Sequence, residues 1–156
     1  MKTKVATDPD YELWVLLCQA CNAMSRAREN EVRKFGLSMM QAGLLLIVKA
    51  IGERATPAEI SRWLFREPHT VSGLLDRMEK QGLVRKVKNL ERKNLIRVVI
   101  TEKGEEAYQR SREMKSIHMM LSCLSLEERK NLKSYLEALR NRAVEELRPR
   151  HRLPFP

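Results

Sequence analysis

The segment Arg85–Thr101, RKVKNLERKNLIRVVIT, decides the fold because it is a β-like stretch inside an otherwise helical pattern. Its residue types predict one strand at 84–88 and a second at 95–101, with a charged and polar loop at 89–94 between them. We therefore expect an antiparallel hairpin whose loop is too polar to pack in a core.

Three helix signals precede this hairpin. Ser38 lies three residues before a glutamine, which predicts a capping box at the start of a helix that ends at Gly52. The Thr-Pro pair at 56–57 predicts a second, short helix, and the Glu-Pro pair at 67–68 predicts its interruption and the start of a third helix that ends at Gly82. Three short helices followed by a hairpin is the order of a winged helix-turn-helix.

Longer helices are predicted on both sides of this unit. Asp8 and Pro9 can open a first helix, whose apolar stripe is broad enough to be buried on two sides and fades in the charged run 26–34. After the hairpin we expect one helix from Glu102 to about Leu121. Ser125 then predicts a capped final helix with leucines at helical spacing.

The positive charge of the chain is concentrated around the hairpin. The 156 residues carry a formal net charge of +10, and residues 61–100 hold ten Lys/Arg against four Asp/Glu. A basic middle between nearly neutral arms indicates contact with a polyanion such as DNA. A merely solvated basic surface remains the alternative that charge alone leaves open.

Five stretches of the sequence resemble the MarR family of regulators (multiple antibiotic resistance regulators). They are LSMMQAGLLLIV at 37–48, ATPAEISRWL at 55–64, HTVSGLLDRMEKQGLVRKV at 69–87, RVVITEKGEEAY at 97–108 and LSLEERKNLKSYLEAL at 124–139. The resemblance spans roughly residues 10–147, and its most specific part is the run 70–87. It implies a mainly helical fold, with a winged helix-turn-helix DNA-binding domain at 35–101.

The resemblance also implies a homodimer. Residues 8–34 and 102–147 would form the helical dimerisation region, and residues 148–156 would be a tail. Two recognition helices of a two-fold dimer dock in successive major grooves, about 34–36 Å apart, on a pseudo-palindromic site. The implied function is that of a transcriptional repressor that binds double-stranded DNA sequence-specifically and is released from it by a small-molecule effector. The alternative is a winged-helix protein that binds nucleic acid without sequence preference, or a protein adaptor.

Ten residues are predicted to bind DNA, and they fall on two elements. On the third helix of the unit, which is expected to be the recognition helix, they are His69, Thr70, Ser72, Gly73 and Arg77. On the hairpin they are Arg85, Lys86, Lys88, Arg92 and Lys93. Several keep a second interpretation. His69 can be an ordinary exposed helix start, Gly73 can serve close helix packing instead of close approach to DNA, and Arg77 can pair with a neighbouring acid, Asp76 or Glu79.

The hairpin departs from the family at its tip. In the family this hairpin is called the wing, and its tip commonly has the sequence Asp-x-x-Asp-x-Arg. Residues 89–94 here have the sequence NLERKN. Arg92 or Lys93 is therefore expected to enter the minor groove, with Glu91 to orient it.

The remaining features predict neither an enzyme nor a membrane protein. No Gly-rich phosphate loop, nucleophile–base arrangement or metal cluster is evident, so we expect no catalytic activity, cofactor or metal. No signal peptide or spanning segment is evident, which favours a cytoplasmic location. Cys18 and Cys21 form a C-x-x-C on one helix face. Burial as small apolar residues in a dimer core is the favoured interpretation, with redox sensing and zinc binding as alternatives.

Overall fold

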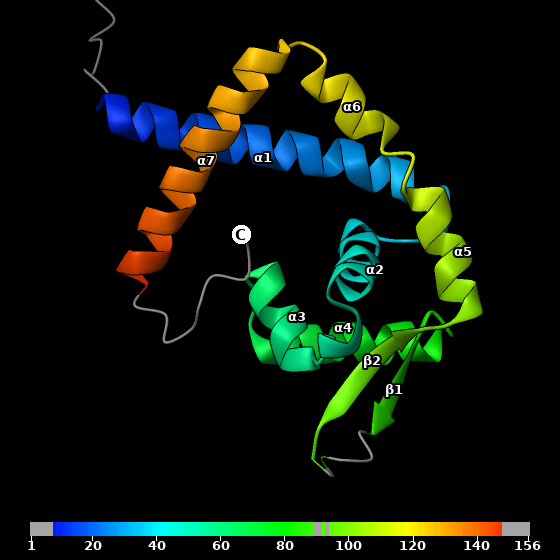
Figure 1. Cartoon of the computed structure of the whole chain (residues 1–156). Helices are drawn as coiled ribbons and strands as arrows, with labels where there is room; N and C mark the ends of the chain where they lie inside the picture. The colour runs from blue at the N-terminus through cyan, green and yellow to red at the C-terminus, as the bar shows by residue number, and fades with distance from the viewer. Residues whose placement is uncertain (1–7, 89–91, 93, 148–156) are drawn as a thin grey trace, which may run out of the picture.

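The computed structural model describes residues 8–88, 92 and 94–147 (Figure 1). The elements in this part of the chain are, in order, α1 (Pro9–Arg33), α2 (Met39–Ile51), the 3-10 turn η1 (Gly52–Arg54), α3 (Pro57–Leu64), α4 (Pro68–Lys80), β1 (Val84–Lys88), β2 (Ile96–Ile100), α5 (Glu102–Ser111), α6 (Lys115–Leu121) and α7 (Leu126–Glu146).

The hairpin forms where the sequence predicts it. β1 and β2 pair antiparallel, with Val84 opposite Ile100 and Lys88 opposite Ile96. The backbone N–H of Val98 also donates to the carbonyl of Ala55 at 2.7 Å, which ties β2 to the turn before α3. The order helix, helix, helix, hairpin confirms the predicted winged helix-turn-helix.

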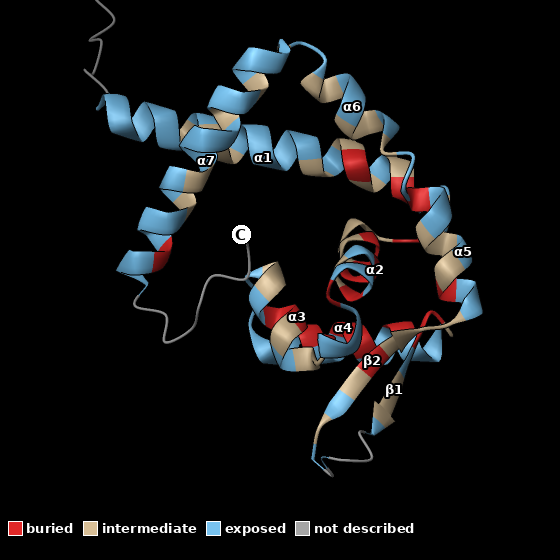
Figure 2. Cartoon of the chain, in the orientation of Figure 1, coloured by how far each residue is buried: buried red, intermediate tan, exposed pale blue. Residues whose placement is uncertain are grey.

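The hydrophobic core lies inside this winged lobe. Figure 2 shows the buried residues gathered on α2, α3, α4 and the hairpin, whereas α7 and the first half of α1 are mostly exposed. The largest fully buried side chains are Leu44, Leu45, Ile60, Leu75, Met78, Val32, Val71, Val84 and Val98. The apolar faces of α2, α3, α4 and the hairpin, together with Val32 of α1, thus meet in one cluster, and the opposite faces of these elements point outward.

The predicted helix caps are confirmed at several starts and stops. Ser38 and Gln41 form a full capping box on α2, and α2 ends at Gly52, whose φ is +54°. The hydroxyl of Thr56 accepts from the N–H of Glu59 at 3.2 Å, which begins α3. Ser125 and Glu128 form the capping box of α7. These local signals place the elements within one or two residues of the prediction.

α1 remains helical through the charged run in which its apolar stripe fades, within the bounds 8–34 expected for this segment. It continues to Arg33, because the charges at its C-terminal end have partners in the fold. Arg28 is buried, and its Nη2 donates to the carbonyl of Ser111 at 2.7 Å. The charged run, which on sequence alone resembles a solvated helix end, is therefore the segment of α1 that packs on α5 and α6.

The expectation of one helix from Glu102 to about Leu121 is wrong. α5 ends at Ser111 and α6 begins at Lys115, after Met114 adopts a left-handed conformation with φ of +49°. The carboxylate of Glu31 accepts from the N–H of Lys115 at 2.7 Å and from that of Ser116 at 3.2 Å. The break is stabilised by a capping carboxylate from another helix, a signal absent from the local sequence.

Candidate nucleic-acid interface

The helix α4 has one face in the core and one in solvent. Val71, Leu74, Leu75 and Met78 are buried at helical spacing. Pro68 stands in the first turn, and the preceding Glu67 makes no side-chain cap. The N–H groups at the start of α4 are therefore not capped by a side chain, and the positive end of the helix dipole faces outward.

All five residues predicted on the recognition helix are exposed: His69, Thr70, Ser72, Gly73 and Arg77. They share the face opposite the core. A Cβ added to Gly73 would meet nothing within 4 Å, so helix packing does not explain this glycine. The pairing of Arg77 with Asp76 or Glu79 is likewise not seen in the part of the chain that the structure describes; Lys86 pairs with both acids instead.

The hairpin residues differ in how they are placed. Arg85 and Lys88 are exposed, as is Arg92. Lys86 lies opposite Val98, which is buried, so the Lys86 side chain lies on the inward face of the hairpin. Its side chain is only 26% exposed and is engaged by carboxylates of α4. Lys93 and the orienting Glu91 lie outside the described residues.

Two cations beside this surface were not predicted. Lys80 lies seven residues after Gly73 and is exposed on α4, and Arg66 is exposed in the turn between α3 and α4. The Ser61 hydroxyl donates to the Arg66 carbonyl at 2.5 Å and fixes this turn. The spacing of seven from Gly73 was a usable signal for Lys80, because such residues share a helix face. Arg66 offers no comparable periodic signal.

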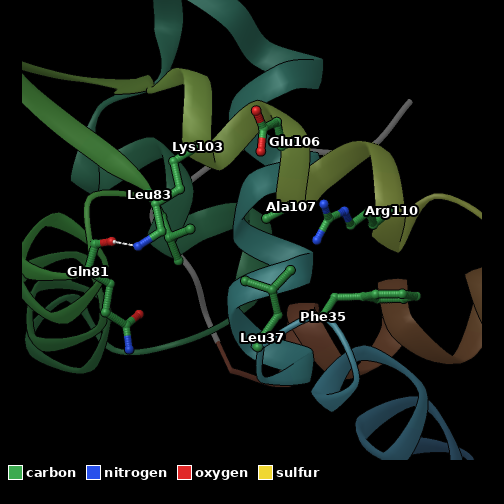
Figure 3. A pocket seen from close by; sticks show the side chains of 9 residues that line it. Phe35, Leu37, Gln81, Leu83, Lys103, Glu106, Ala107 and Arg110 are labelled. Carbon is green, nitrogen blue, oxygen red and sulfur yellow. Dashed lines mark hydrogen bonds between the residues drawn. The ribbon is translucent and has the colours of Figure 1, made fainter.

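A cavity of about 390 Å³ adjoins the C-terminal end of α4 (Figure 3). Its walls come from the α1–α2 turn, the α4–β1 turn and one side of α5, where Lys103, Ala107 and Arg110 recur at helical spacing. The Lys103 ammonium donates to the Gln81 carbonyl at 2.7 Å. This hydrogen bond therefore connects the C-terminal end of α4 to α5.

A second cavity of about 340 Å³ lies between α1, α2, α5 and α6. Its lining is mostly apolar, and its polar members are Ser25, Arg28, Ser111 and Arg112. The apolar lining residues include Met24, Met39, Leu46, Tyr108, Met114, Ile117 and Met120. Its volume lies in the range of small-molecule pockets, and methionines adapt to irregular ligand shapes.

The cysteines are free. Cys18 is half-buried, and Cys21 and Cys123 are exposed. No three side chains of the metal-ligating types come together in the described ranges. No helix in those ranges is long and apolar enough to cross a membrane.

Comparison with known proteins gives one family. Residues 35–89 match the model of the MarR family. The protein of Bacillus subtilis (strain 168) called uncharacterized HTH-type transcriptional regulator YfiV is 24% identical over 108 residues, which are 69% of this chain and 67% of that protein.

The solved structures agree in fold. The organohalide-sensing regulator RdhR-CbdbA1625, in its 2,4-dichlorophenol-bound form, superposes with a TM-score of 0.80 at 29% identity, over 88% of this chain and 82% of that one. A mutant MarR from E. coli in complex with operator DNA gives 0.77 at 18% identity, over 85% and 99%. AbsC of Streptomyces coelicolor, a MarR family transcriptional regulator, gives 0.80 at 21% identity, over 94% and 99%.

Proposed function

The chain belongs to the MarR family of winged helix-turn-helix transcriptional regulators, and on this premise we propose that it is a homodimeric repressor of a pseudo-palindromic DNA operator, relieved by a small-molecule effector. The observation that carries the proposal is the division of α4 into a buried apolar face and an exposed face of small polar and charged residues. An exposed helix of this kind fits the major groove, and the cations of the adjoining hairpin can reach the backbone.

The dimer is supported by apolar side chains that the single chain leaves in solvent. On α1 these include Trp14, which is 62% exposed, and on α7 they include Tyr135, which is 66% exposed. Further members are Tyr11, Leu13, Leu16, Leu136, Leu139 and Leu147. Exposed large apolar side chains that recur on two helices indicate a surface that associates, and the regions 8–34 and 102–147 are the ones proposed for dimerisation.

The effector is supported by the second cavity. It lies between α1, which we assign to the dimer, and α2, which belongs to the winged lobe. A ligand that favours one spacing of the two lobes would change the fit of two recognition helices to their half-sites. The relative RdhR-CbdbA1625 is an organohalide sensor solved with 2,4-dichlorophenol. An apolar ligand with one polar group, able to reach Arg28, is the class that we propose for this chain.

Selection of genomic or random DNA fragments by the purified protein tests the function. We expect recovery of one inverted-repeat sequence, with binding that survives excess unrelated competitor DNA. Recovery of fragments with no shared sequence would instead support the alternative of a non-specific nucleic-acid binder, and recovery of no DNA would support the adaptor. Addition of apolar phenols to the complex then tests for an effector through release of the operator.

A further inference from the structure

The recognition helix carries two carboxylates on its exposed side. Asp76 follows Ser72 by four residues and Gly73 by three, so it lies one turn further along the same face of α4. Its side chain is 57% exposed, and that of Glu79 is 41% exposed. Negative charge on a face that meets DNA is repelled by the phosphates unless a cation neutralises it.

Lys86 of the hairpin supplies this cation. Its Nζ forms an ion pair and hydrogen bond with the Asp76 carboxylate and lies 3.8 Å from Oε2 of Glu79. Its backbone N–H also donates to Oε1 of Glu79 at 2.9 Å. One residue of β1 therefore contacts both acids of α4, through its side chain and its main chain.

The charge state of Asp76 agrees with this contact. The hydrogen bond from Lys86 is the largest cause of a pKa below the ordinary aspartate value, followed by the charge of Lys86 and, after a small opposing effect of burial, that of Lys80. Asp76 is thus held as a carboxylate with Lys86 as its counterion.

Resting on the proposed function, we propose that Lys86 is a positioning residue that fastens the wing to the recognition helix and neutralises its carboxylates, and is not itself a DNA contact. This changes the role that the sequence alone assigned to Lys86. It also separates the hairpin cations into two groups. Arg85 and Lys88 are exposed and available to phosphate, whereas the ammonium of Lys86 is oriented toward the protein.

The two roles predict different effects of a Lys86 substitution on DNA affinity once Asp76 and Glu79 are neutral. If Lys86 contacts phosphate, its removal weakens binding whether or not Asp76 and Glu79 are charged. If Lys86 only neutralises these acids, it becomes dispensable once they are neutral. Three variants separate the roles: Lys86→Met, Asp76→Asn with Glu79→Gln, and the triple substitution.

We expect Lys86→Met to weaken binding of operator and of random DNA by about tenfold or more, because two unpaired carboxylates then face the phosphates. The triple variant should return to within about threefold of the wild type. Fluorescence anisotropy at several salt concentrations measures both. A triple variant as weak as Lys86→Met, or a Lys86→Met variant that binds like the wild type, would overturn the proposal. Weaker binding to operator alone in the Asp76→Asn, Glu79→Gln variant would assign base reading to the acids and also overturn it.

Net charge needs a matched control. Lys86→Met combined with Glu102→Gln and Glu106→Gln has the same formal charge as the triple variant. Glu102 and Glu106 are exposed on α5, and within the described ranges neither forms an ion pair. This control should stay as weak as Lys86→Met. Its recovery to wild-type affinity would show that overall charge, and not the contact with Asp76 and Glu79, restores binding.

A measurement without DNA distinguishes failure of this proposal from failure of the proposed function. Wild-type protein that selects no DNA would overturn the proposed function. The contact itself is tested by NMR titration of the Asp76 side-chain carbon in the full chain. We expect the midpoint to rise toward the ordinary aspartate value in Lys86→Met, with an unchanged fold by circular dichroism. A midpoint that stays the same would overturn the contact, whatever the DNA results.

Discussion

Glu31 on α1 and Ser116 on α6 are joined twice, because the backbone N–H of Ser116 donates to the Glu31 carboxylate at 3.2 Å and its hydroxyl donates to the same oxygen. Arg28 donates to that oxygen at 2.7 Å. Burial opposes the charge of Glu31, but these hydrogen bonds outweigh it and lower the pKa of Glu31 to about 2. The carboxylate therefore holds the start of α6 against α1.

We expect Glu31→Gln to lower the free energy of unfolding by about 1–3 kcal/mol at neutral pH, because a largely buried Arg28 then has no charged partner at this position. The folded pKa is below the unfolded value, so this contribution is full above about pH 5 and disappears as the pH falls from the ordinary glutamate value of 4.5 toward 2. Urea unfolding at pH 7 and pH 3, at one protein concentration, measures both effects.

Glu137→Gln is the matched control, because Glu137 is 40% exposed and pairs with Lys133 at 3.7 Å on the surface of α7. Its effect should stay within about 0.5 kcal/mol. Equal destabilisation by the two substitutions at neutral pH, or a Glu31 effect that persists unchanged at pH 3, would contradict the role given to Glu31.

Gly104→Ala should destabilise the chain strongly. A Cβ at this position would lie 2.0 Å from the carbonyl oxygen of Leu83 and 2.8 Å from a methyl of Ile100. Backbone must shift to admit it, and we expect the free energy of unfolding to fall by about 2 kcal/mol or more. The effect should appear as a lower midpoint in urea. A variant as stable as the wild type would show that α5 can move away from the hairpin at little cost.

Gly73→Ala should have the opposite effect on stability. Nothing lies within 4 Å of the added Cβ, and alanine is favoured over glycine in a helix by about 1 kcal/mol. We expect a variant that is more stable but binds operator more weakly, because the methyl separates the backbone of α4 from the groove. Urea unfolding and anisotropy on the same sample give both numbers. Unchanged operator affinity would remove Gly73 from the interface.

The helix starts and the hairpin could be predicted because their causes are local. Ser38, Thr56 and Ser125 cap the residues that follow them, and such pairs are visible in the sequence. The break between α5 and α6 could not, because its cap is Glu31, more than eighty residues earlier in the chain.

The same distinction applies to the candidate site. Helical periodicity placed the exposed face of α4 correctly. The partner of Asp76 was not predictable, because it lies on another element and is set by the register that puts Lys86 opposite the buried Val98.

The apolar surface of α1 and α7 leads to a prediction about assembly. Trp14→Glu together with Leu139→Glu introduces charge into both exposed apolar faces and should convert a dimer into a monomer. Sedimentation equilibrium measures the mass. Lys88→Glu, on the exposed surface of the hairpin and outside the regions proposed for dimerisation, is the control and should leave the dimer intact. A dimer that survives the first pair of changes would place the subunit interface elsewhere.

Substitutions on the recognition helix and on the hairpin should weaken DNA binding in different ways. Thr70→Ala and Ser72→Ala remove exposed hydroxyls at the start of α4 but no charge. Where such a hydroxyl reads a base edge, its removal should reduce operator affinity by about 1–3 kcal/mol, with little change on random DNA.

Arg85→Ala with Lys88→Ala removes two exposed cations of β1 and should weaken binding to all DNA. The slope of log affinity against log salt should become shallower by about 0.9 for each phosphate that the variant no longer neutralises. Titration of operator and random duplexes at four salt concentrations gives affinity and slope together. Equally weakened binding to both duplexes by the helix variants, or an unchanged slope for the hairpin variant, would show that base reading and phosphate binding are assigned to the wrong elements.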